Sequence, residues 1–299
     1  MIALLAPGQG SQAPGMLTPW LSSPGARDLV AGWSATTGLD LERLGTSADA
    51  EEITDTAVTQ PLVVALALLA HAQLPVAAPD TQLVAGHSVG ELAAAAVAGV
   101  LSADDAVALA AARGAEMGRA CALEPTGMSA VLGGDPEQVL TRLAELELVP
   151  ANRNGGGQVV AAGRRADLDS LAESPPEKAR VIPLSVAGAF HTVFMAPAQD
   201  AFAARAAQVT PADPTRPLLS NADGSVVTDG ADYLARIVAQ ITQPVRWDLC
   251  TETMRAHEVT AVVELPPAGT LVGLARRQLK GTPTLALKSP EDLAKVAAL

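Results

Sequence analysis

The stretch that most constrains the fold is residues 83–94, where an apolar run leads through Gly86-His87-Ser88-Val89-Gly90 into an alanine-rich run of helical length. A buried strand, a sharp turn with serine at its apex and a helix form the G-x-S-x-G nucleophile elbow. The glycines allow strand and helix to approach closely, and N–H groups at the helix start can face an anion beside Ser88. An ordinary Gly-Ser turn is the alternative, but the flanks on both sides favour Ser88 as a nucleophile.

Composition restricts the class of protein. The 299 residues are 49% hydrophobic but only 2% aromatic, so Ala, Leu and Val must build a globular core. The apolar run at 61–70 is too short to span a membrane, and residues 1–6 lack the basic flank of a signal peptide. A net charge of −12 with no basic stripe argues against nucleic-acid binding. Cys121 and Cys250 match no zinc or redox spacing, so we expect reduced core cysteines in a cytoplasmic protein.

A second glycine-rich turn precedes the elbow. Residues 2–6 predict a buried strand that runs into Pro7-Gly8-Gln9-Gly10-Ser11-Gln12. This turn lacks the spacing and the lysine of a phosphate-binding loop, and it fits better as the second N–H donor of an oxyanion hole. The next apolar segment, 54–74, predicts a helix whose simplest role is in the core, with Pro61 near a helix start.

One arginine falls on an apolar helix face. Ser102-x-x-Asp105 predicts the start of a helix, and Arg113 shares a stripe with apolar residues at three- and four-residue spacings. A buried guanidinium is costly unless it is paired. Its partner is either an internal carboxylate, such as that of Glu116, or a substrate carboxylate held by a bidentate fork. The sequence leaves both open.

The middle of the chain has a different pattern. We expect strands at 128–132, 149–152, 158–162 and 179–186, and helices at 136–146 and 166–172. The order β-α-β-β-α-β is that of the ferredoxin-like split unit. The α/β pattern then resumes, with helices at 233–241 and 247–256 and a strand at 261–265. The sequence therefore predicts an α/β protein with a large domain of residues 1–126 and 188–299 and an inserted ferredoxin-like α+β subdomain of residues 127–187.

A serine nucleophile requires a base, and the chain has four histidines. His71 and His257 end predicted helices and fit structural roles. His87 is adjacent to Ser88, so its side chain should point away from it. His191 follows a glycine-rich loop at the domain junction and is the best candidate.

The sequence resembles the malonyl-CoA:acyl carrier protein transacylases of bacterial type II fatty acid synthesis over essentially the whole chain. Each motif alone is weak, whereas all six in this order are specific. They are Gly8-Gln9-Gly10-Ser11-Gln12, Thr59-Gln60-Pro61, Gly86-His87-Ser88-Val89-Gly90-Glu91, Arg113-Gly114, Gly188-Ala189-Phe190-His191 and Pro244-Val245-Arg246-Trp247.

The resemblance implies an α/β-hydrolase-like domain with a parallel sheet, a ferredoxin-like insert and an active site between them. It implies Ser88 as nucleophile and His191 as base, with the main-chain carbonyl of Gln240 orienting the histidine. One departure is local: the family usually has Gly-Pro-Gly after the strand ending at Glu264, where this chain has Leu265-Pro266-Pro267-Ala268-Gly269. We expect that loop to differ without affecting the catalytic positions.

The same resemblance assigns substrate contacts. The backbone N–H groups of Gln9 and Val89 would form the oxyanion hole, and Arg113 would bind the free carboxylate of malonate with Gln60 nearby. Phe190 resembles the bulky residue that excludes a 2-methyl branch in malonyl-selective members. Coenzyme A thioester would be a substrate, with no permanently bound cofactor and no metal.

The implied reaction is ping-pong transfer of malonyl from malonyl-CoA to the phosphopantetheine thiol of acyl carrier protein, in fatty acid or polyketide biosynthesis. The carrier protein is acidic in this family, and the densest basic cluster, Arg276, Arg277 and Lys280, is a candidate dock, with a solvated helix face as the alternative. Family members are generally monomeric.

Two other functions compete with transfer. A serine hydrolase shares the elbow, but its usual chain order requires a histidine near the C-terminus, where only His257 is available. A non-catalytic acyl-binding scaffold would not require Ser88, His191 and Arg113 together.

Overall fold

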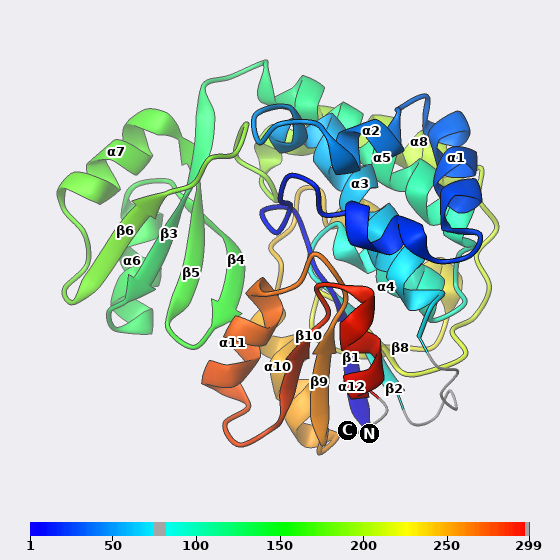
Figure 1. The fold of residues 1–299 in the computed structure, drawn as a ribbon. Helices are drawn as coiled ribbons and strands as arrows, with labels where there is room; N and C mark the ends of the chain where they lie inside the picture. Colours follow the sequence, from blue (N-terminus) through cyan, green and yellow to red (C-terminus); the bar gives the residue numbers. More distant parts are fainter. Residues whose placement is uncertain (75–81, 297–298) are drawn as a thin grey trace.

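Two sheets form the framework of the computed structural model, which describes residues 1–74, 82–296 and 299 (Figure 1). One has the strand order β10-β9-β1-β2-β7-β8, and the other has the order β4-β5-β3-β6. The first contains β1 (Ile2–Ala6), β2 (Gln82–Gly86), β7 (Leu218–Leu219), β8 (Val226–Val227), β9 (Ala261–Glu264) and β10 (Thr284–Ala286). The second contains β3 (Thr126–Gly133), β4 (Val149–Gly155), β5 (Gln158–Arg164) and β6 (Ala179–Pro183). The expected mixed α/β class is confirmed.

Helices cover both faces of the first sheet. The helices of the described residues are α1 (Ala26–Thr37), α2 (Leu41–Thr46), α3 (Thr56–His71), α4 (Gly90–Val97), α5 (Ala103–Cys121), α6 (Pro136–Glu145), α7 (Arg165–Glu173), α8 (Ala196–Ala206), α9 (Gly230–Ala239), α10 (Trp247–Ala256), α11 (Thr270–Gln278) and α12 (Leu293–Val296). Of these, α6 and α7 pack against the second sheet instead. Leu4 and Val84 pack with the α3–α5 side, whereas Leu5 and Leu83 pack against α10 and α11. A strand that is buried on both faces has a continuous apolar sequence, because side chains on both sides face the core. This explains the sequences of β1 and β2.

The register of the parallel strands positions the two glycine-rich turns. β1 pairs with β2 so that Ala6 lies opposite Gly86, and the His87 N–H donates to the Ala6 carbonyl at 3.0 Å. Parallel strands end at the same sheet edge, where α/β proteins place their ligands. The turn after β1 and the elbow after β2 therefore lie side by side.

The second sheet is antiparallel and has the predicted ferredoxin-like connectivity, with α6 and α7 between its strands. It lies beside α10 and α11 in Figure 1. The strand expected over 179–186 ends at Pro183. Residues 184–190 then connect β6 to His191, which lies at the junction of the two sheets.

Several bounds differ from expectation. α4 extends past residue 94 and ends at Val97, shortly before Gly99, which adopts a positive φ of 83°. Pro61 lies inside α3, whose start is capped by Asp55, and not near the helix start. α1 and α2 were not predicted. Cys121 and Cys250 are free, and only Cys250 is fully buried. None of the helices described combines the length and apolarity needed to cross a bilayer.

Helices α3 and α5 approach closely at Gly114. A Cβ built there would lie 2.6 Å from the Thr56 carbonyl oxygen and 3.2 Å from the Ala57 Cα, whereas a Cβ at Gly118 would meet no described heavy atom within 4 Å. The missing side chain at 114 therefore sets the distance between the helix that carries Arg113 and the helix that carries Gln60.

These two glycines form a matched pair on one helix. Gly114→Ala should lower the free energy of unfolding by about 2 kcal/mol through overpacking. Gly118→Ala should raise it by about 0.5–1 kcal/mol through helix propensity. Urea denaturation measures both, and equal effects of the two substitutions would contradict the close helix contact.

Candidate active site

The turn between β2 and α4 has the geometry of an elbow. Ser88 adopts a positive φ of 55°, a strained conformation for a residue with a side chain. A Cβ on Gly86 would lie 2.1 Å from the carbonyl of Gly90, and one on Gly90 would lie 2.3 Å from the Ala6 oxygen. Only glycine fits at either position, so the sequence pattern follows from the packing of β1, β2 and α4.

The structure brings Ser88 and His191 together across 103 residues of sequence. Ser88 Oγ lies 2.8 Å from His191 Nε2, and His191 Nδ1 lies 2.7 Å from the main-chain oxygen of Gln240. Because a carbonyl only accepts, Nδ1 carries the proton and Nε2 presents its lone pair to the serine hydroxyl. A main-chain carbonyl here occupies the position of the acid in a Ser-His-Asp triad.

The environment keeps this imidazole neutral. Burial, and secondly the positive charge of Arg113, lower the pKa of His191 from 6.5 to about 3. A neutral imidazole is the form that removes a proton from a hydroxyl, so the pair can generate a nucleophilic oxygen across the neutral pH range.

Arg113 is a buried cation beside Ser88. Its side chain is 1% exposed; Nη1 donates to Gln60 Oε1 at 2.8 Å, and Nη2 donates to Gln240 Oε1 at 3.0 Å. Nη2 also lies 3.4 Å from Ser88 Oγ. Burial lowers the pKa of Arg113 to about 10, so it remains charged at neutral pH.

The carboxylate nearest to Arg113 in sequence does not neutralise its charge. Glu116, the internal partner considered above, binds Arg119 on the outer side of α5. No carboxylate of residues 1–74 or 82–296 forms an ion pair with Arg113. The guanidinium is bonded to two neutral amide oxygens and to the serine hydroxyl, so its positive charge has no carboxylate in direct contact.

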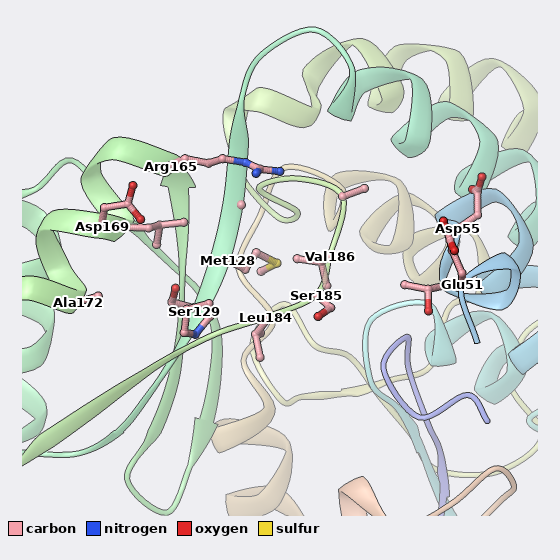
Figure 2. Close-up of a pocket in the computed structure, with 15 residues that line it drawn as sticks. Glu51, Asp55, Met128, Ser129, Arg165, Asp169, Ala172, Leu184, Ser185 and Val186 are labelled. Atoms are coloured by element: carbon pink, nitrogen blue, oxygen red, sulfur yellow. The ribbon is translucent and has the colours of Figure 1, made fainter. Parts of the chain in front are cut away.

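Ser88, His191 and Arg113 line one small cavity of about 80 Å³. It is lined by Gln9, Gln60, His87, Ser88, Arg113, Met117, Met128, Asn152, Val160, Leu184, Val186, Phe190 and His191. Met128, Leu184 and Val186 also line a wider cavity of about 760 Å³ between the antiparallel sheet and residues 51–55. Figure 2 shows this wider cavity, with Arg165 and Asp169 on one side and Glu51 and Asp55 on the other. The small cavity therefore adjoins a larger one.

The two expected oxyanion donors are available. Gln9 lines the small cavity, and Val89 follows the nucleophile at the start of α4. Within residues 1–74 and 82–296, neither main-chain N–H donates to a protein acceptor. The Gln9 side chain donates to Thr56 Oγ1 at 3.3 Å.

Among the described residues, the side chains of the other histidines form no hydrogen bond with Ser88. His87 Nε2 lies 2.9 Å from Asn154 Oδ1, and its ring packs on Trp247 with centroids 5.4 Å apart. His71 ends α3, and His257 is exposed at the end of α10. The described residues contain no cluster of His, Cys, Asp and Glu side chains able to hold a metal ion.

Two buried polar residues beneath the elbow had no role in the sequence interpretation. Asn221 Oδ1 accepts from the Ser88 N–H at 2.8 Å, and the Glu91 carboxylate is 1% exposed. Glu91 is part of the elbow motif, which is the signal that could have found it. Asn221 follows the two-residue strand β7, which is too short to be recognised from periodicity.

Two predicted surface features lie away from the cavity. Arg276, Arg277 and Lys280 are exposed at the end of α11, where Arg277 donates to Gln158 Oε1 of β5 at 3.3 Å. The loop that departs from the family pattern is fixed by Glu264, whose carboxylate accepts N–H bonds from Gly269, Leu271 and Val272.

Comparisons with known proteins agree on one family. A family model described as acyl transferase domain matches residues 4–295. The malonyl CoA-acyl carrier protein transacylase of Mycobacterium tuberculosis is 65% identical, with both chains covered completely. The crystal structure of MCAT from Mycobacterium tuberculosis has a TM-score of 0.97, with 65% identity and 99% of each chain covered. A malonyl-transacylase solved in complex with a type II PKS acyl-carrier protein has a TM-score of 0.88, with 28% identity and 98% of each chain covered.

The pKa of His191 can be tested with a serine-directed fluorophosphonate. Because the imidazole stays neutral down to about pH 3, the labelling rate of Ser88 should change less than about twofold between pH 8 and pH 5.5. An imidazole with the usual pKa of about 6.5 would lose about tenfold over this range. Ser88→Ala is the unlabelled control, and a decrease with a midpoint near 6.5 would refute the shifted pKa.

Proposed function

The chain belongs to the acyl transferase family and, within it, to the malonyl CoA-acyl carrier protein transacylases, and we propose that it transfers malonyl through an ester on Ser88. The observation that carries this assignment is the buried, carboxylate-free Arg113 placed 3.4 Å from the serine oxygen of a Ser-His pair. A nucleophile beside an unneutralised cation suits an acyl group that ends in a carboxylate.

Acylation starts at the Ser88–His191 hydrogen bond. His191 Nε2 takes the hydroxyl proton as Ser88 Oγ attacks the thioester carbonyl of malonyl-CoA. The main-chain N–H groups of Gln9 and Val89 stabilise the tetrahedral oxyanion, each contributing on the order of 3 kcal/mol to lowering the barrier. The C–S bond then breaks, coenzyme A takes the proton from His191, and malonyl remains on Ser88.

Transfer to the carrier protein repeats these steps in reverse. His191 deprotonates the phosphopantetheine thiol, which attacks the malonyl ester. The oxyanion occupies the same hole, and Ser88 leaves with the proton held by the imidazole. The Gln240 carbonyl keeps Nδ1 protonated in both half-reactions.

Arg113 provides the selection of the acyl group. A malonyl carboxylate would form charge-assisted hydrogen bonds with the guanidinium, which Gln60 holds in place from α3. An acetyl group would leave that buried charge without an anionic partner, which is unfavourable. Phe190 in the cavity wall would limit space for a branch at the second carbon.

The remaining expectations stay predictions. These are residues 127–187 as a subdomain inserted between 1–126 and 188–299, a cytoplasmic monomer, and a carrier-protein dock at Arg276, Arg277 and Lys280. The acceptor would belong to fatty acid or polyketide biosynthesis, and coenzyme A would be present only as part of the substrate.

A covalent intermediate tests the function directly. Mixing the protein with malonyl-CoA should add one malonyl group to Ser88, detected by intact and peptide mass spectrometry. Adding holo acyl carrier protein should then move that group to the carrier. Ser88→Ala should form no adduct. Rapid release of free malonate would indicate a hydrolase, and the absence of any adduct would indicate an acyl-binding scaffold.

Acyl selectivity tests the role of Arg113. Arg113→Ala should lower kcat/KM for malonyl-CoA by about a hundredfold, because a charge-assisted bidentate contact is lost, while the slow acetyl transfer should change less than about tenfold. Arg119→Ala removes an exposed arginine from the same helix and is the matched control. Equal losses with both acyl groups would show that Arg113 is only structural.

A further inference from the structure

The carboxylate of Glu91 is buried beneath the active site and takes no part in the mechanism above. Glu91 lies in the first turn of α4 and is 1% exposed. Its Oε2 accepts from Gln240 Nε2 at 2.6 Å, and its Oε1 accepts from the main-chain N–H of Asn221 at 2.6 Å. Burying a carboxylate is costly, so its retention here calls for a specific partner.

Gln240 connects three functional groups at once. Its main-chain oxygen accepts from His191 Nδ1, and its side-chain Oε1 accepts from Arg113 Nη2 at 3.0 Å. Its Nε2 donates to Glu91 and, at 3.1 Å, to Asn221 Oδ1. A primary amide turned by 180° keeps its shape but exchanges donor and acceptor. The orientation of this amide therefore decides whether Arg113 meets an oxygen or an NH₂ group.

We propose that Glu91 is a positioning residue for malonyl transfer: its acceptor-only carboxylate holds the Gln240 amide with the oxygen toward Arg113, and thereby holds the guanidinium in the orientation that receives the malonyl carboxylate. This inference rests on the proposed function of Arg113. The Glu91 carboxylate acts through Gln240 and is hydrogen-bonded to neither the Ser88 hydroxyl nor the His191 ring. The main-chain N–H of Glu91 donates to the Ser88 carbonyl at 3.0 Å as part of the first turn of α4.

The hydrogen-bond donors around Glu91 indicate the protonation state of its side chain. Both oxygens face N–H groups, so a carboxylic acid proton would have no acceptor among them, and the carboxylate is the form that fits. Burial raises the pKa of Glu91 from 4.5 to about 8, and the Asn221 N–H and the positive charge of Arg113 oppose this rise. The charged form is assigned from the two N–H donors that the carboxylate oxygens face. The negative charge of Glu91 and the positive charge of Arg113 are therefore bridged by the side-chain amide of Gln240.

The Gln240 amide keeps the Glu91 carboxylate out of direct contact with Arg113, and this affects how the guanidinium can bind a substrate. A carboxylate in direct contact with Arg113 would compete with the substrate for the guanidinium. Glu91 instead acts through the Gln240 amide, so the attraction between opposite charges stabilises the buried arginine without occupying its N–H groups. The cation is held in place, and its anion-binding capacity is kept.

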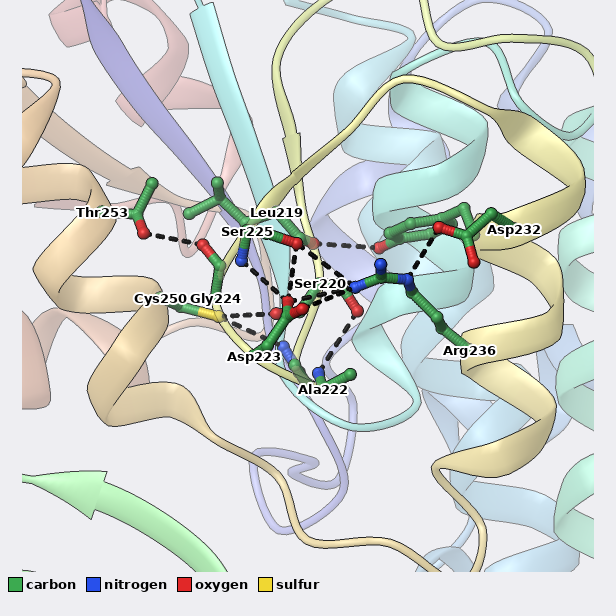
Figure 3. Close-up of polar contacts among 12 residues, drawn as sticks. Leu219, Ser220, Ala222, Asp223, Gly224, Ser225, Asp232, Arg236, Cys250 and Thr253 are labelled. Atoms are coloured by element: carbon green, nitrogen blue, oxygen red, sulfur yellow. Dashed lines mark hydrogen bonds and ion pairs between the residues drawn. The ribbon is translucent and has the colours of Figure 1, made fainter.

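The other partner of Glu91 is fixed, which leaves the Gln240 amide as the group that Glu91 controls. Asn221 lies between Ser220 and Ala222 in the chain, and Figure 3 shows the hydrogen bonds and ion pairs that hold the labelled residues of this turn. Arg236 Nη1 donates to Asp223 Oδ2 at 3.0 Å, and Thr253 Oγ1 donates to the Gly224 carbonyl at 2.7 Å. The Asn221 side chain is itself held between the Ser88 N–H and the Gly86 carbonyl.

Glu91→Gln tests the proposal with an isosteric change. The new NH₂ group must face either the Asn221 N–H or Gln240, and it is accommodated only if the Gln240 amide turns its NH₂ toward Arg113. We expect kcat/KM for malonyl-CoA to fall at least about tenfold, mainly through KM. Acetyl transfer and fluorophosphonate labelling of Ser88 should each change less than about threefold.

A second buried carboxylate supplies the matched control. Glu264 is 0% exposed and also accepts main-chain N–H bonds, but it caps α11 away from the cavity. Glu264→Gln should lower the free energy of unfolding with little change in the malonyl-to-acetyl ratio. If Glu91→Gln behaves in the same way, or lowers both acyl transfers equally, Glu91 is only structural and the proposal is overturned.

The exchange variant Glu91→Gln with Gln240→Glu covers the case in which the single variant does not fold. It restores a donor-to-acceptor match between positions 91 and 240, but the carboxylate oxygen introduced at position 240 then faces the acceptor Asn221 Oδ1, so stability should recover only in part. It also places a carboxylate directly on Arg113, so the malonyl preference should not recover. Recovery of that preference would overturn the proposal.

Failure of the proposed function gives a different result. In that case the wild-type chain itself would form no malonyl ester, whereas failure of the Glu91 proposal leaves that ester in place.

Discussion

The site depends on a buried guanidinium whose protein contacts are neutral. A charge with the burial of Arg113 is normally paired with a carboxylate, since removing it from water is costly. Here Gln60 and Gln240 supply amide oxygens, and Glu91 supplies negative charge one amide further away. The cation is thus stabilised enough to remain buried and is still able to bind a carboxylate. Transfer of an acid-terminated acyl group follows from this incomplete neutralisation.

The fold brings that cation to the nucleophile through close backbone approaches. Gly86 and Gly90 let β1, β2 and α4 meet at the elbow, and Gly114 lets α5 lie against α3. The same sheet edge carries the turn with Gln9 and the elbow with Ser88. His191 lies in the segment that follows the last strand of the antiparallel sheet, so the proposed catalytic pair forms where the two sheets meet.

The local parts of the site were predictable from sequence because they depend on short-range chemistry. The elbow follows from two glycines around a serine, and the position of Arg113 follows from the spacing on its helix. The pairing of His191 with Ser88 and of Gln240 with His191 came from elimination and family resemblance, and the distances agree with both.

The remaining interactions were not predictable, because they join residues far apart in the chain. Asn221 and Gln240 lie 130 and 149 positions from Glu91, and no periodicity connects them. The sequence also left the partner of Arg113 open, since a helical stripe shows that a charge is buried without showing what faces it. The internal position of Pro61 reflects tertiary packing, which outweighs local propensity.

A crystal structure of the malonyl-enzyme tests the central claim most directly. It should show an ester at Ser88 Oγ whose free carboxylate accepts two hydrogen bonds from Arg113, with Gln60 and Gln240 still bound to the same guanidinium. A malonyl carboxylate that points to solvent, or an Arg113 that leaves the cavity, would contradict it.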